Sequence, residues 1–234
     1  MIYLLGANGD IGINISSNFK KKDVEFISVT RKPSKDNIGF NDFLKEISNK
    51  KDVLVINSAK LSLEDLNLFT ISAPSCTRVV HISSVAVYGN SNFSNIVSPI
   101  NSYGNFKVME EKKLNQFFST FIIRLSNIYG GNPETSGAMK LYNSNKLNYI
   151  EVDEKNNELI RDYIEIEKFI NVVYKNLDFV NTKIINVSSG FGITLTDFFY
   201  LNNINISNIK RKLFDRKTVI EKSIIDNNFV SNKI

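Results

Sequence analysis

The chain starts Met1-Ile-Tyr-Leu-Leu-Gly-Ala-Asn-Gly-Asp-Ile-Gly12, and this stretch decides the predicted fold. Residues 2–5 form an uncharged apolar run, as expected of a parallel strand that is buried on both faces. Gly6, Gly9 and Gly12 follow where the chain must turn from strand into helix. The first glycine permits a tight turn, the second lets backbone approach a diphosphate, and the third lets helix and strand pack closely. Because a helix that begins here points unpaired N–H groups at phosphates, the stretch predicts a dinucleotide-binding loop.

The spacing of this loop is G-x-x-G-x-x-G, whereas the common dinucleotide fingerprint is G-x-G-x-x-G. Three glycines also occur in ordinary loops, so the interpretation depends on a strand before them and a helix after them. Both are predicted here, at residues 2–5 and 11–21. Because the strand starts at residue 2, we also expect no signal or targeting peptide ahead of it.

Strands and helices alternate along the first half of the chain at the spacing of β-α-β units. Further strands are predicted at residues 24–30, 53–57, 78–83 and 120–125, and further helices at residues 43–50, 61–72 and 103–118. This alternation predicts an α/β fold with a doubly wound parallel sheet of the Rossmann type. After Gly130 the pattern loosens. We therefore expect a dinucleotide-binding domain at 1–130, with a later strand returning near 160–190, and a small, partly interleaved substrate lobe at 131–234.

Composition indicates a globular protein without a membrane segment. Of the 234 residues, 42% are hydrophobic and 23% are charged, which is ordinary for a globular domain. No apolar run approaches the roughly 18 residues that span a bilayer. The single cysteine, Cys76, excludes an intramolecular disulfide and fits a reducing compartment, so we expect a cytoplasmic protein.

The net charge of +5 is compatible with binding either nucleic acid or anionic nucleotides. Lysines and arginines are dispersed, with local clusters at residues 20–22 and 210–212, so we expect no nucleic-acid partner. His81 is the one histidine, and the sequence has no cysteine–histidine cluster, so we expect no metal site either.

A second group of polar residues follows the strand predicted at 78–83. Ser84 lies at the end of this strand, and Tyr103 and Lys107 lie on the next predicted helix. Residues four apart share one face of a helix, so the ammonium favours the ionised phenol and lets Tyr103 exchange protons near neutral pH. The Ser84 hydroxyl can bond the same substrate oxygen, because open α/β sheets bind ligands at the carboxyl ends of their strands. Tyr-x-x-x-Lys alone more often marks an exposed helix. Here the motif indicates a catalytic site because it follows the glycine loop and the serine in this order.

With these motifs in this order, the sequence resembles the extended short-chain dehydrogenase/reductase family of NAD(P)-dependent sugar-nucleotide epimerases, dehydratases and ketoreductases. The resemblance runs from Ile2 to about Thr194. It implies that Tyr103 is the catalytic acid/base, that Lys107 tunes it and holds the nicotinamide ribose, and that Ser84 orients the sugar carbonyl. The cofactor contacts that it implies are Gly6, Asn8, Gly9, Asp10, Ile11, Gly12, Ser58, Ala59, Tyr103 and Lys107.

Three later motifs also match the family pattern. Residues 124–130 resemble the strand and loop whose asparagine, here Asn127, reaches the nucleotide sugar. Residues 161–164 resemble the segment whose arginine, here Arg161, contacts the substrate diphosphate, and residues 185–190 resemble the late strand of the substrate lobe. The substrate site that the resemblance implies consists of Ser84, Val85, Asn127 and Arg161.

The end of the second predicted strand indicates which cofactor is bound. NAD-binding proteins place an acidic residue there, which accepts hydrogen bonds from the ribose 2′-hydroxyl. This chain has Thr30-Arg31-Lys32 instead. Guanidinium and ammonium groups bind a 2′-phosphate, so Arg31 and Lys32 predict NADP(H) as the preferred cofactor, with NAD(H) as the other possibility. The alternative explanation is that both residues only solvate a loop.

A preference for NADP favours a net reductase, because the family's epimerases and dehydratases recycle a bound NAD. The sequence thus predicts reduction of the keto group of a nucleotide-activated sugar, of the 4-keto-6-deoxy type, in polysaccharide precursor synthesis. One alternative is an NAD-dependent nucleotide-sugar 4-epimerase. Another, from a different class, is a non-catalytic nucleotide-binding protein on the same fold. A dehydratase is not favoured, because Val85-Ala86 stand where such enzymes place an acid pair.

Relatives commonly form homodimers through the helices predicted here at 61–72 and 103–118. The segment between Asn57 and Ser83 is shorter than the family pattern, and 44 residues follow Gly190. We therefore expect a small substrate lobe and treat a homodimer as one possible assembly.

Overall fold

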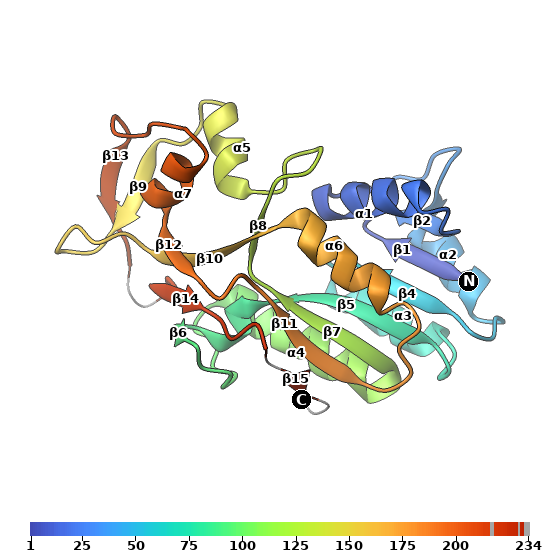
Figure 1. Cartoon of the computed structure of the whole chain (residues 1–234). Helices are drawn as coiled ribbons and strands as arrows, with labels where there is room; N and C mark the ends of the chain where they lie inside the picture. Colours follow the sequence, from blue (N-terminus) through green and yellow to red (C-terminus); the bar gives the residue numbers. More distant parts are fainter. Residues whose placement is uncertain (216–217, 229, 232–234) are drawn as a thin grey trace.

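The centre of the molecule is an eight-stranded sheet in which the first strand of the chain lies third from one edge (Figure 1). The computed structural model describes residues 1–215, 218–228 and 230–231. From one edge to the other, the sheet consists of β15 (Val230–Ser231), β11 (Lys183–Val187), β7 (Ser119–Leu125), β5 (Arg78–Ser84), β4 (Leu54–Asn57), β1 (Ile2–Leu5), β2 (Ile27–Thr30) and β3 (Ile38–Gly39). All neighbours are parallel except β15, which runs antiparallel to β11. Because the chain moves outward from β1 in both directions, a crevice lies at the carboxyl ends of β1 and β4.

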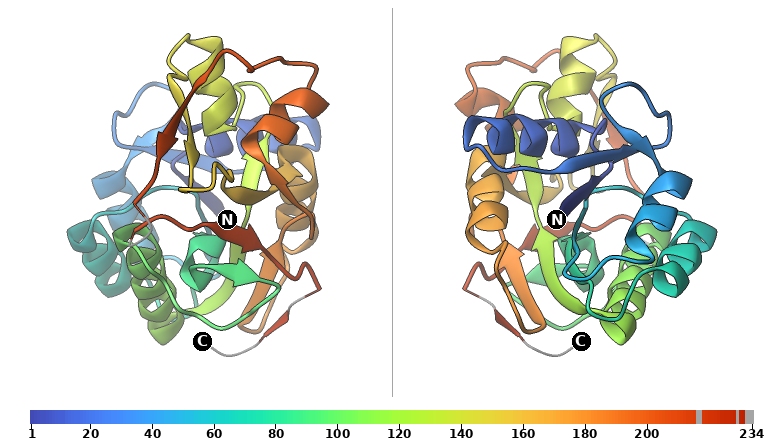
Figure 2. Two further views of the ribbon diagram at one scale, coloured as in Figure 1. Left: turned by 90° about the vertical axis from the view of Figure 1, so that its left-hand side faces the viewer. Right: turned by 90° about the vertical axis from the view of Figure 1, so that its right-hand side faces the viewer.

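Helices cover both faces of this sheet (Figure 2). On one face lie α1 (Asp10–Lys21) and α6 (Ile166–Lys175), whose apolar side chains share a core with the sheet, including Leu4, Ile15, Phe19, Phe121 and Phe169. On the other face lie α2 (Phe40–Ile47), α3 (Leu63–Ser72) and α4 (Ser102–Phe117), with a core that includes Tyr3, Phe43, Leu66, Phe69 and Leu114. The predicted doubly wound parallel sheet is confirmed.

The remaining strands form a smaller layer beyond the carboxyl ends of the main sheet, at the left of Figure 1. Its strands are β6 (Ser91–Asn92), β8 (Asn127–Tyr129), β9 (Tyr149–Val152), β10 (Ile160–Glu165), β12 (Gly192–Thr194), β13 (Lys210–Leu213) and β14 (Lys222–Ile224). β10 pairs with β8, β12 and β14, and β9 pairs with β13. A core that includes Ile150, Val152, Phe198 and Phe199 joins this layer to α5 (Gly137–Asn143) and α7 (Leu195–Leu201).

Two predicted strands differ from the structure. Residues 185–190 resemble a strand of the substrate lobe, but β11 lies in the main sheet beside β7, because its alternate residues Ile184 and Asn186 are buried there. The strand predicted at 24–30 begins at Ile27, after Asp23 takes a positive φ of 52°. The segment after Gly190 forms β12 and then α7, because Thr194 and Asp197 build a capping box that starts the helix at residue 195.

The predicted lobe extends to residue 234, and residues 216–217, 229 and 232–234 lie outside the described part of the chain. Within the described part, none of the helices has the length and apolar character needed to cross a membrane.

Candidate active site

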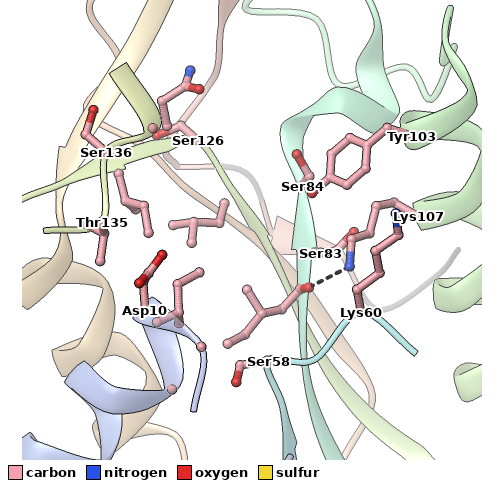
Figure 3. Close-up of a pocket in the computed structure, with 18 of the residues that line it drawn as sticks. Asp10, Ser58, Lys60, Ser83, Ser84, Tyr103, Lys107, Ser126, Thr135 and Ser136 are labelled. Carbon is pink, nitrogen blue, oxygen red and sulfur yellow. Dashed lines mark hydrogen bonds between the residues drawn. The ribbon is translucent and has the colours of Figure 1, made fainter. Parts of the chain in front are cut away.

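Two adjoining cavities, each of about 560 Å³, lie at the carboxyl ends of the central strands. The catalytic-side cavity is lined by the start of α1, the ends of β5 and β7, and the first turns of α4, and by β8 and the start of α5 from the smaller layer (Figure 3). The second cavity is lined by the glycine loop, the end of β2 and the turn after β4. Both cavities share Gly9, Ser58, Ala59 and Lys60. Together they form one groove along the carboxyl ends of the central strands.

The glycine loop brings the N-terminus of α1 against this groove. A Cβ on Gly12 would lie 2.1 Å from the carbonyl oxygen of Gly6, so only glycine lets the helix approach the loop this closely. The N-cap of α1 is Gly9, which offers no side chain to the first N–H groups of the helix. Those N–H groups therefore face the cavity lined by Gly9, Asp10, Ile11 and Gly12. Such a helix end fits the diphosphate of a dinucleotide.

Contacts from the smaller layer hold the start of α1. Asp10 forms an ion pair with Lys140 of α5, so the carboxylate that lines the cavity is balanced by a cation. Asn14 donates to the carbonyl of Pro133 at 2.9 Å and accepts the N–H of Asn132 at 3.0 Å. The phosphate-binding end of α1 is thereby joined to the loop that follows β8.

Ser84, Tyr103 and Lys107 meet in the catalytic-side cavity (Figure 3). Ser84 ends β5, and its Oγ accepts the N–H of Ala86 at 3.2 Å, which leaves the hydroxyl proton to donate to a substrate oxygen. Tyr103 lies in the first turn of α4 and is 47% exposed. A Cβ on Gly104 would lie 2.5 Å from the carbonyl oxygen of Ala86, so this glycine lets α4 approach the serine and brings the phenol beside it.

Lys107 is buried, unlike Tyr103 one turn before it. Its Nζ donates to the carbonyl oxygen of Ile82 at 3.3 Å, the bond that is dashed in Figure 3. On its other side, Nζ lies 2.8 Å from a carboxylate oxygen of Glu110, which has no exposed surface. These two contacts therefore fix the Lys107 side chain, with its ammonium at the wall of the cavity.

A second buried ion pair fastens α4 to the sheet. Glu111 accepts hydrogen bonds from Nε of Arg124 at 3.1 Å, from Nη2 of Arg124 at 2.7 Å and from the hydroxyl of Ser83 at 2.5 Å. Arg124 also donates to the Tyr88 hydroxyl at 3.0 Å, which in turn donates to Asn186 at 2.7 Å. Burial alone would lower the pKa of Arg124, but the hydrogen bonds and charge of Glu111 raise it. Arg124 is thus a buried partner in an ion pair and not a solvated charge at a strand end.

Neither a protein-family model nor a curated protein matches the sequence. Solved structures do match its fold. The UDP-glucose 4-epimerase of Thermus thermophilus, in complex with NAD, superposes with a TM-score of 0.76 at 15% identity, over 97% of this chain and 90% of that one. The UDP-glucose 4-epimerase of Thermotoga maritima, with UDP-glucose, gives a TM-score of 0.74 at 15% identity, over the same shares of the two chains. A dTDP-4-dehydrorhamnose reductase of Clostridium acetobutylicum gives 0.70 at 20% identity, again over 97% and 90%.

This chain has the fold of the extended short-chain dehydrogenases/reductases. The likeness covers both the main sheet and the smaller layer, because nearly the whole chain superposes on these proteins. Proteins with this fold and different reactions match about equally well, so the fold does not decide the reaction.

The structure brings most of the predicted site residues to the groove. Those that line the catalytic-side cavity are Gly9, Asp10, Ile11, Gly12, Ser58, Ala59, Ser84, Tyr103, Lys107 and Asn127. Those that line the second cavity are Gly6, Asn8, Gly9, Arg31, Lys32, Ser58 and Ala59. The contacts of these residues with a cofactor or substrate stay predictions.

Two residues of the predicted substrate site do not line either cavity. Val85 is buried in an apolar cluster with Val87, Tyr88 and Ile225, because it begins a short 3₁₀ helix that turns inward after Ser84. Arg161 donates to the backbone carbonyl oxygens of Ile160 at 3.0 Å and Glu221 at 3.3 Å. Its neighbour Asp162 is buried and accepts backbone N–H groups of Ser189 and Gly190, so the two do not form a surface ion pair.

Residues that sequence reasoning missed also line the groove, and the polar ones include Lys60, Thr135, Ser136 and Tyr163. Lys60 lines both cavities and follows directly after the predicted contacts Ser58 and Ala59, so its place in the site could have been predicted from the sequence. Tyr163 shares a strand face with Arg161 two residues earlier, which was also visible from the alternation of β10. Thr135 and Ser136 carry no local signal, because only tertiary contacts bring the start of α5 to the cavity.

Proposed function

We propose that this protein is an NADP(H)-dependent oxidoreductase that reduces the keto group of a nucleotide-activated sugar of the 4-keto-6-deoxy type, in polysaccharide precursor synthesis. The observation that carries the proposal is the meeting of Ser84, Tyr103 and Lys107 in one cavity, beside the N-terminus of α1. The matching structures include a dTDP-4-dehydrorhamnose reductase and a UDP-glucose-bound epimerase, which supports a nucleotide sugar as the substrate class. The single cysteine supports a cytoplasmic location.

Each residue of the trio has one task in this reaction. Bound NADPH supplies the hydride. Tyr103 donates the phenolic proton to the oxygen of the sugar carbonyl, and Ser84 holds that oxygen by donating its own hydroxyl proton. The Lys107 ammonium stabilises the phenolate that remains and bonds the nicotinamide ribose. The N-terminus of α1 binds the diphosphate.

The reductase is tested with NADPH and a panel of nucleotide-linked 4-keto-6-deoxyhexoses. Oxidation of NADPH that depends on both the keto sugar and the protein is the expected result. The second candidate is an NAD-dependent 4-epimerase, because two of the matching structures are such enzymes. It is favoured if the purified protein carries oxidised NAD and interconverts two nucleotide sugars without added NADPH.

The preference for NADPH is supported by the lining of the second cavity. Arg31 and Lys32 line it at the end of β2, and Nη2 of Arg31 donates to the Lys60 carbonyl at 2.6 Å. Asp65 is the single acidic residue among the lining residues of this cavity, and its carboxylate already accepts the N–H of Ser62 at 3.3 Å. Asp42, an alternative acid, lies on α2 in an exposed pair with Lys45. The second cavity therefore carries basic side chains at the end of β2, which supports binding of a 2′-phosphate there.

An Arg31→Asp variant tests this preference. We expect NADPH binding to weaken roughly 10- to 100-fold, because a charge-assisted hydrogen bond to phosphate is replaced by repulsion. NADH binding should change little or improve, because the new carboxylate can accept from the ribose hydroxyls. Nicotinamide fluorescence titrations of both cofactors measure the effect, with Lys35→Asp, a change in the following loop, as a charge-matched control. Equal binding of NADPH by wild type and Arg31→Asp would contradict the NADP assignment.

We also infer a homodimer formed through α3 and α4. These helices lie side by side, and Lys113 of α4 forms a hydrogen bond with Asn67 of α3. The exposed apolar side chains on the two helices include Leu63, Leu68, Ile71 and Phe117, and Ile71 is 80% exposed. Sedimentation equilibrium should show a dimer for the wild type and a monomer for Ile71→Lys. A monomeric wild type at all concentrations would contradict the assembly.

A further inference from the structure

Beneath Lys107 lies a buried polar group that the proposed mechanism does not use. It consists of Asn57 on β4, His81 on β5 and Glu110 on α4, and none of the three has solvent-exposed surface. Asn57 and His81 are direct neighbours in the parallel pairing of β4 with β5. Helix α4 crosses above them and places Glu110 between the histidine and the lysine.

Glu110 lies between the lysine and the histidine. One carboxylate oxygen lies 2.8 Å from Nζ of Lys107 and 3.9 Å from Nε2 of His81. The second distance is too long for a hydrogen bond. Within the described part of the chain, His81 Nε2 and both carboxylate oxygens of Glu110 have no hydrogen-bond partner, although one of these oxygens forms the ion pair with Lys107. Buried polar atoms are nearly always hydrogen-bonded, so these unsatisfied atoms mark a site where a small side-chain movement would change the contacts of Lys107.

Asn57 joins the histidine to the cofactor groove. Its side-chain oxygen accepts the N–H of Ala59 at 3.1 Å, so its amide nitrogen is the atom that faces Nδ1 of His81 at 3.2 Å. Nδ1 is then an acceptor, and the proton of the neutral ring is on Nε2, toward Glu110. Ala59 belongs to the turn that lines both cavities. A row of buried polar groups thus runs from that turn to the ammonium of Lys107, with one gap of 3.9 Å between His81 and Glu110.

The charges around these groups come from two elements. Lys107 and Glu111 face Glu110 from α4, and Lys60 faces it from the turn after β4. Burial raises the pKa of Glu110, and Lys107 opposes that shift. Burial, and then the charge of Lys107, hold the pKa of His81 well below its usual range. The His81 ring is therefore neutral, and the ion pair of this group is formed by Lys107 and Glu110.

We propose that Glu110 and His81 are positioning residues: Glu110 holds the Lys107 ammonium at the cavity wall, and the His81–Asn57 pair links this ion pair to the cofactor-lining turn at 58–60. Stability alone does not account for the arrangement, because a buried ion pair is on average no more stabilising than apolar side chains of the same volume. The role of Lys107 in this inference rests on the proposed function. The coupling among the four residues does not.

The coupling can be read directly from His81, because it is the single histidine of the chain. In the full-length protein labelled with 15N-histidine, we expect NMR shifts of a neutral ring with its proton on Nε2. In Lys107→Met, the cation that lowers the pKa of His81 is absent and Glu110 faces the histidine alone, so His81 should take up a proton at higher pH than in the wild type. The double variant Lys107→Met/Glu110→Gln should lose the part of this increase that comes from Glu110, so His81 should titrate at a lower pH there than in Lys107→Met. An unchanged His81 titration in Lys107→Met, or the same increase in the double variant, would overturn the coupling.

The positioning role has a separate test in dinucleotide binding. Glu110→Gln should weaken NADPH binding roughly tenfold, because Lys107 loses the group that orients it. Glu110→Asp should restore part of the affinity, and Glu167→Gln, which neutralises an exposed acid of α6, should bind as the wild type does. Wild-type affinity in Glu110→Gln would refute the positioning role. Failure of the wild type to bind NADPH would instead count against the proposed function, while the His81 titration still decides the coupling.

Discussion

Tyr103→Phe is expected to lower turnover of a keto-sugar nucleotide about 10³-fold, within the range that a positioned general acid contributes. The phenol stands at the cavity beside Ser84, and with 47% of its surface exposed it is not part of the core. Removing its hydroxyl should therefore leave the fold intact and appear chiefly in kcat. The measurement is the rate of NADPH oxidation at saturating substrate.

Tyr200→Phe is the matched control for this loss. Tyr200 lies on α7 with 78% of its surface exposed and lines neither cavity, so its variant should turn over at the wild-type rate. Thermal unfolding of both variants should match the wild type. A Tyr103→Phe protein with full turnover would contradict the assignment of the catalytic acid.

Arg124→Met is expected to lower the free energy of unfolding by about 3–5 kcal/mol, the cost of breaking a buried ion pair by removal of one partner. The change leaves the Glu111 carboxylate buried without the two guanidinium bonds that now satisfy it, at 2.7 and 3.1 Å. It also removes the donor to Tyr88. Urea unfolding at neutral pH measures the loss, which should appear as a lower midpoint with an unchanged slope.

Two variants bracket this effect. Lys168→Met removes one partner of an exposed pair, 3.6 Å from Glu165, and should cost less than about 1 kcal/mol. Arg124→Met/Glu111→Met removes both buried charges and should recover a large part of the loss, because no unpaired charge remains. A loss of less than about 1 kcal/mol in Arg124→Met would show that the pair does not anchor α4.

The main sheet and the meeting of Ser84, Tyr103 and Lys107 in one cavity could be predicted because their signals are local. The apolar run at 2–5 and the glycines after it specify a strand, a turn and a helix within twelve residues. Tyr103 and Lys107 are one helical turn apart, so their proximity follows from helix geometry alone. Ser84 joins them through the order of parallel strands, which the alternation of strands and helices already indicates.

The smaller layer and the buried groups could not be predicted because their partners are distant in sequence. β10 pairs with a strand more than thirty residues before it and with another about sixty residues after it, and β14 has three residues, too few for a periodic signal. His81 and Glu110 each fit an ordinary pattern, a buried strand and a charged helix. The structure alone brings them together with Asn57.

We propose that the groove directs hydride from NADPH to the carbonyl of a nucleotide-linked keto sugar. The most direct measurement is a reaction with NADPH deuterated at either the pro-R or the pro-S position of the nicotinamide, followed by mass spectrometry of the sugar product. We predict that one of the two samples, and not the other, yields a product sugar heavier by one deuterium, with stoichiometric formation of NADP. A product that gains no deuterium from either sample, formed while NADPH is not consumed, would contradict the claim and identify the protein as an enzyme that recycles its own bound cofactor.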